Sequence, residues 1–183
     1  MISNNKKGQM GVEGVVLLVV VLAIILILGF VAVIGSSALN YVFDEVVPEL
    51  SGLGDVGGVN MSVASEYTLT PANALVPNLT WITGVIYVIM LLGSIGLAYS
   101  IRSNPSGWLI ALYFFLVLLL IALSIFISNM YQDIYTGTDT FNGIVQEHSL
   151  MSYMMLYSPV INAIIAFISG FIMFSGRKEE GYI

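Results

Sequence analysis

The 183-residue chain lacks cysteine and is poor in charged residues. Without cysteine, the chain has no disulfide, no thiolate metal ligand and no thiol catalyst. Charged residues make up 9% of the chain, whereas a soluble domain carries about 25%. Lysine and arginine number five against eleven acidic residues, a net charge of −6 that is too negative to hold a phosphate backbone. These shortages exclude a soluble globular enzyme, a disordered tail and a nucleic-acid-binding protein.

Long apolar runs dominate the chain, and hydrophobic residues make up 58% of it. A helix needs about 20 apolar residues to cross a bilayer. Four runs reach this length, at residues 14–39, 81–101, 108–128 and 153–175. Each run is predicted to be helical, because open sheet edges cannot be satisfied in hydrocarbon. The sequence therefore predicts an all-α fold, a four-helix transmembrane bundle embedded in a lipid bilayer.

The five cations predict how this bundle is oriented. In a four-span topology all of them fall on one side of the membrane, at Lys6, Lys7, Arg102, Arg177 and Lys178. Positive residues collect on the cytoplasmic side. We therefore predict that both termini are cytoplasmic, with an N-terminal segment at residues 1–13, an inner turn at 102–107 and a tail at 176–183.

Two acidic outer loops complete this topology, at residues 40–80 and 129–152. In the first loop, the glycine-rich residues 51–60 predict a turn, and residues 63–70 predict a short strand. Asn60 and Asn78 match the glycosylation sequon and are candidate acceptors on the outer side.

The second outer loop holds a polar, turn-like cluster at residues 136–142. Residues 143–151 predict a short interfacial helix. This segment contains the single histidine of the chain, His148, which we expect to be exposed in the loop.

The N-terminus reads KKGQMGVEGVVLLVVV, a basic pair followed by Gly8, Gln9 and then Glu13 at the edge of the first apolar run. Residues 4–35 resemble the class III, prepilin-like signal segment of archaeal type IV pilins. The resemblance implies that a membrane peptidase cuts between Gly8 and Gln9, and that Glu13 pairs with the free amine of a neighbouring subunit. The alternative for Glu13 is a hydrated residue at the cytoplasmic interface, or one that favours the start of its helix. Three further spans follow here, whereas pilins have one such helix and a soluble head.

Asn162 is the one strongly polar side chain deep in the fourth run. It is predicted to hydrogen-bond across to another helix, and lining a pore is the alternative. Pro159 has no backbone N–H and predicts a local kink in the same run. Small residues four apart, such as Ala166 and Gly170, predict close helix contacts.

Motifs for catalysis or for binding a cofactor are missing from the sequence. It contains no glycine-rich phosphate loop, no HExxH and no GxSxG. One histidine cannot build a zinc site without several carboxylates. We therefore predict no catalytic residue, no metal and no cofactor.

Three functions remain open. The first is a non-catalytic structural or assembly role in a cell-envelope or virion membrane complex, with other membrane subunits as partners and with an oligomer as one form. The second is a small channel or passive transporter subunit. The third is an accessory subunit of a larger membrane complex that carries the chemistry.

Overall fold

A computed structural model describes residues 4–73, 76–102, 107–137 and 140–175 of the chain. The elements are, in order, α1 (Asn4–Gly52), β1 (Asp55–Val56), β2 (Val59–Asn60), α2 (Met61–Asn73), α3 (Val76–Ser100), α4 (Gly107–Tyr135), α5 (Thr140–Glu147), α6 (Ser149–Leu156) and α7 (Ser158–Phe174). Helices make up nearly all of the described chain, which confirms the all-α prediction.

Three helices are long and apolar enough to cross a membrane, over Gly11–Gly52, Trp81–Ser100 and Gly107–Tyr135. Each of them covers almost all of a predicted span. The second candidate contains 20 residues, which at about 1.5 Å per residue is about 30 Å, the thickness of the hydrocarbon core. A fourth candidate span exists if α6 and α7 are taken together.

The fourth run is not one straight helix. α6 and α7 are bent by 74° at a break at Tyr157. Pro159 lies in the first turn of α7, where its missing N–H costs nothing because the first amides of a helix have no helical acceptor. Pro159 therefore starts a new helix, and the predicted kink is a full break.

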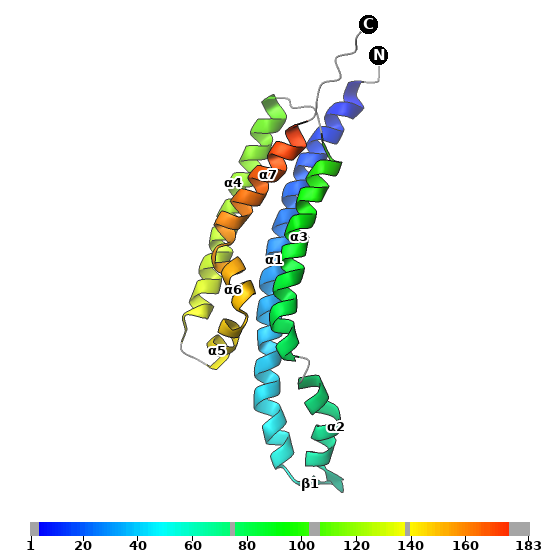
Figure 1. Cartoon of the computed structure of the whole chain (residues 1–183), viewed down its shortest axis with the longest axis vertical. Helices are drawn as coiled ribbons and strands as arrows, with labels where there is room; N and C mark the ends of the chain where they lie inside the picture. Colours follow the sequence, from blue (N-terminus) through cyan, green and yellow to red (C-terminus); the bar gives the residue numbers. More distant parts are fainter. Residues whose placement is uncertain (1–3, 74–75, 103–106, 138–139, 176–183) are drawn as a thin grey trace.

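α1 is the longest element and extends well beyond its neighbours (Figure 1). Its apolar candidate span contains 42 residues, or about 63 Å of helix, twice the thickness of a bilayer core. The distal part of α1 lies beside α2 and the β1–β2 hairpin, away from the other helices (Figure 1). The first predicted outer loop is therefore largely helical.

The strand predicted at residues 63–70 is wrong, because these residues belong to α2. Asn60 explains the difference: its Oδ1 accepts a hydrogen bond of 3.1 Å from the Val63 N–H and so caps the start of α2. The predicted turn within residues 51–60 is confirmed. Gly57 and Gly58 both have positive φ, 61° and 83°, and form the two-residue turn of the antiparallel β1–β2 hairpin.

The helices lie side by side in alternating directions (Figure 1). α1 packs against α3 and α4, and α7 packs against α3 and α4, while α5 and α6 fill the space between α1 and α4. α1 begins, α3 ends, α4 begins and α7 ends at one end of the molecule, which we call the N-terminal end. The opposite end is called the hairpin end.

Glycines allow aromatic rings to approach the helix backbones closely. A Cβ atom at Gly29 of α1 would lie 2.5 Å from Cε2 of Tyr87 and 2.9 Å from Cε of Met151. A Cβ atom at Gly170 of α7 would lie 2.6 Å from Cε1 of Tyr113. Tyr87 and Met151 are fully buried, so the ring cannot move aside without disturbing the core.

Replacing Gly29 with alanine should therefore destabilise the protein by about 1–3 kcal/mol, the usual cost of overpacking a core. Gly35→Ala is the matched control, because Gly35 lies on the same helix with no atom within 4 Å of its missing Cβ. The control should be neutral or stabilising by up to about 1 kcal/mol. Unfolding in mixed micelles, followed by circular dichroism, measures both. Equal effects of the two substitutions would contradict the packing of Tyr87 against α1.

Candidate functional site

Buried polar side chains gather in two places among the described helices. One group lies where α4 meets α6 and α7, and contains Ser124, Ser128, Ser158 and Asn162. We call it the α4–α7 polar contact. The other surrounds His148, between α5 and α6.

The α4–α7 polar contact is a chain of hydrogen bonds between helices. Asn162 Nδ2 donates to Ser124 Oγ at 2.9 Å. Ser124 Oγ in turn donates to the Leu120 carbonyl at 2.8 Å, and so it accepts from one helix and donates within its own. Ser158 Oγ donates to the Ser124 carbonyl at 3.3 Å. These bonds join the first turns of α7 to the middle of α4.

The same contact satisfies a backbone carbonyl that the break at Tyr157 leaves without its helical donor. In an unbroken helix the Leu156 carbonyl would accept from Val160, but the Val160 N–H bonds to Tyr157 instead. Ser128 Oγ donates to the Leu156 carbonyl at 2.6 Å. Such replacement is what permits a broken helix at membrane depth. The geometry thus favours a structural role for the serines of α4.

His148 is fully buried, so the prediction of an exposed loop histidine is wrong. The segment folds back because α5 and α6 pack against α1 and α4. His148 Nε2 lies 3.4 Å from Ser36 Oγ of α1. The Ser36 hydroxyl also lies 3.1 Å from the Val33 carbonyl of its own helix. This contact links α1 to the α5–α6 junction.

A tyrosine of α4 and a serine of α6 form a further buried contact. Tyr131 OH and Ser152 Oγ are 2.7 Å apart, and Ser152 Oγ is 3.1 Å from the Val145 carbonyl. Tyr131 and Ser152 are both buried. Within the described residues, no three histidine or acidic side chains lie together where they would hold a metal ion.

The other predicted site residues are scattered. Gly8 and Gln9 lie on the first turns of α1, and nothing is described of the Gln9 side chain. Glu13 is exposed on α1, Asn60 is exposed at the start of α2, and Asn78 is exposed near the start of α3. Glu13 lies at the N-terminal end and Asn60 at the hairpin end, so the structure does not bring them into one site.

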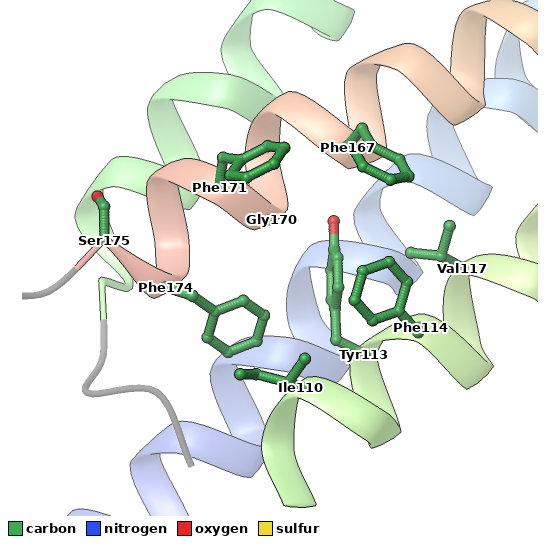
Figure 2. A pocket seen from close by; sticks show the side chains of 9 residues that line it. All are labelled: Ile110, Tyr113, Phe114, Val117, Phe167, Gly170, Phe171, Phe174 and Ser175. Atoms are coloured by element: carbon green, nitrogen blue, oxygen red, sulfur yellow. The ribbon is translucent and has the colours of Figure 1, made fainter. Parts of the chain in front are cut away.

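An apolar groove lies between α4 and α7 near the N-terminal end (Figure 2). It encloses about 300 Å³. Its walls are mainly aromatic and come from both helices: Ile110, Tyr113, Phe114, Val117, Phe167, Gly170, Phe171, Phe174 and Ser175. The Tyr113 hydroxyl donates to the Ala166 carbonyl across the floor of this groove.

Arg102 lies at the Ser175 end of the groove. From the sequence it was predicted only to mark the cytoplasmic side, not to belong to a site. Its Nη2 donates to the Ser175 carbonyl at 2.7 Å, one of the last carbonyls of α7 that lack a helical donor. Its guanidinium carbon lies 5.9 Å from the centre of the Tyr99 ring. The sequence signalled the close contact of α4 and α7 only through the small residues Ala166 and Gly170, because Gly170 leaves room for the Tyr113 ring.

The Asn162–Ser124 bond should be measurable as a coupling energy. We expect a double-mutant cycle of Asn162→Ala and Ser124→Ala to give about 0.6 kcal/mol, and at most about 1.7, as for other hydrogen bonds between membrane helices. The cycle is read from unfolding in mixed micelles. Ser94→Ala is the control partner, because Ser94 Oγ bonds only to Leu91 of its own helix among the described residues. Coupling of Asn162 to Ser94 as strong as to Ser124 would contradict the contact.

Comparison with known proteins yields no relationship on which to base a function. The scan against protein-family models finds no match. The searches of curated proteins and of solved structures likewise find no similar chain.

Proposed function

We propose that this chain is a four-span membrane protein with both termini in the cytoplasm, and that it is a non-catalytic structural or assembly subunit of an envelope membrane complex. The distribution of charge along the molecule supports the orientation. Arg102 lies at the N-terminal end, whereas exposed acids of α1 such as Asp44, Glu45 and Glu49 lie toward the hairpin end. Cations favour the cytoplasmic side.

An outward apolar face of α1 supports the assembly role. Val16, Val20, Ile24, Ile27 and Val31 follow one another at helical spacing and are 40–58% exposed. We call them the α1 stripe. Large exposed apolar faces mark contacts with lipid or with another protein. β-branched side chains also have few rotamers to lose when a neighbouring helix packs on them.

The exposed carboxylate of Glu13 is the observation on which the proposal mainly rests. It lies three residues before Val16, on the same exposed side of α1. A carboxylate beside an apolar helix face is costly unless it is paired, and no side chain that the structure describes forms an ion pair with Glu13. A partner amine from a neighbouring subunit would satisfy it. Processing between Gly8 and Gln9, as the prepilin resemblance implies, would supply such an amine.

The inner polar side chains favour this role over a pore. Asn162, Ser124 and Ser158 bond to one another or to backbone carbonyls of a facing helix. Asn162 Nδ2 and the two serine hydroxyls are engaged in these bonds, while Asn162 Oδ1 is buried without a hydrogen-bond partner among the described residues. Bonds of this kind hold helices together. The outward surfaces, and not the interior, are therefore the proposed functional surfaces.

Single-cysteine crosslinking tests the proposal, because the native chain has no cysteine. In native membranes, Val20→Cys on the α1 stripe should form a crosslinked dimer on oxidation. Leu22→Cys is the matched control: Leu22 lies two residues away on the same helix but is fully buried. Adding Glu13→Gln should lower the dimer yield several-fold, whereas Glu45→Gln should leave it unchanged, because Glu45 lies outside the stripe.

Equal crosslinking of Val20→Cys and Leu22→Cys, or equal effects of the two glutamate substitutions, would overturn the assembly role. The intact mass of the same sample shows whether residues 1–8 have been removed. A crosslinked dimer that retains these residues would support the contact between α1 stripes. It would exclude the Gln9 amine as the partner of Glu13.

A further inference from the structure

The apolar groove between α4 and α7 continues along the outer surface of α7. A second hollow of about 300 Å³ adjoins it, and the two share Phe167 and Phe171 as walls. The second hollow is lined only by apolar residues of α7. Figure 2 shows Phe167 and Val117 at one end of the first hollow and Ser175 at the other. The space is therefore elongated, apolar along its length and polar at one end.

The polar end of this groove has a fixed positive charge. Arg102 is the one lysine or arginine whose side chain the described residues include. The bond to Ser175 anchors the guanidinium through one nitrogen. A guanidinium carries five N–H donors in a planar fork that matches phosphate oxygens. The anchored side chain is exposed, so its remaining donors are able to bind an anion from outside.

The surroundings place this charge at a membrane surface. Trp108, at the first turn of α4, and Tyr99, near the end of α3, are both more than 60% exposed. Exposed tryptophan and tyrosine at the ends of apolar helices are typical of the level of the lipid headgroups. The groove then extends from this level toward the centre of the membrane.

From this geometry we propose that the groove is a binding site for an anionic phospholipid. One acyl chain lies along Phe171 and Phe167, and the phosphate is held by Arg102. The shape and charge of the groove favour this occupant: it is apolar along its length and ends at an exposed guanidinium, which matches an acyl chain joined to a phosphate. The inference goes beyond the assembly role and needs only that the helices lie in a membrane. In the proposed orientation the lipid belongs to the cytoplasmic leaflet.

Native mass spectrometry of the full chain in detergent tests the proposal. The protein is titrated with phosphatidylglycerol, which is anionic, and with phosphatidylcholine of the same acyl chains, which is zwitterionic. We expect one tightly bound phosphatidylglycerol per chain. Its affinity should exceed that of phosphatidylcholine by about fivefold, which is the effect of one arginine near an anionic headgroup.

Two variants separate the contribution of the lipid headgroup to binding from that of the acyl chain. Arg102→Gln should abolish the preference while leaving weak binding of both lipids. Phe171→Ala should weaken the binding of both lipids and keep the preference for phosphatidylglycerol. Phe115→Ala is the matched control, since Phe115 is similarly exposed on α4 but does not line the groove. Arg102→Lys guards against misfolding of the glutamine variant, because it keeps the charge and should retain most of the preference.

Three results would overturn the proposal. The first is equal affinity of the native protein for the two lipids. The second is an unchanged headgroup preference in a folded Arg102→Gln variant. The third is a dimer that dissociates when Phe171 is truncated, which would place a second copy of the chain in the groove.

Discussion

The structure depends on the rule that no backbone group stays open where water is absent. The break between α6 and α7 removes helical hydrogen bonds in the middle of the molecule. Ser128 of α4 replaces one of them by donating to the Leu156 carbonyl at the end of α6. The Ser158 hydroxyl donates to the Ser124 carbonyl, and Asn162 Nδ2 donates to the Ser124 hydroxyl. In a medium that offers no other partners, these bonds fix the position of α7 against α4. The groove between the same two helices follows from that position.

α1 imposes the second constraint, because it is about twice as long as a bilayer is thick. Its inner face is buried against α3 and α4, at residues such as Leu18, Leu22 and Leu26. Its distal half holds α2 and the hairpin, which have no core of their own. One helix thus supports both the membrane part and the projecting part. Its outward face remains uncovered in the single chain and is the surface from which the proposed assembly follows.

The long helices were predictable from the sequence, because a bilayer requires spans of about 20 apolar residues and requires them to be helical. Pro159 predicted only a local kink, whereas the structure has a break of 74° between α6 and α7, and α4 satisfies the Leu156 carbonyl that the break leaves open. The structure of the outer segments was predictable only in part: the turn within residues 51–60 was predicted, and the helix at residues 63–70 was not. Residues 63–70 are helical because Asn60 caps them, and His148 is buried because α5 and α6 fold back on α1. The cap is a local contact, whereas the burial of His148 and the anchoring of Arg102 at Ser175 depend on contacts between distant segments.

Topology mapping tests the central claim, four crossings with both ends on one side, most directly. Gly52, Gly107 and Gly143 are suitable positions for single cysteines, because nothing lies within 4 Å of a Cβ atom at any of them. A membrane-impermeant maleimide added to intact cells should label the cysteines at positions 52 and 143. The cysteine at position 107 and a tag at the C-terminus should be reached only after permeabilisation. Labelling of position 107 from outside, or exposure of the tag on the same side as position 143, would contradict the account.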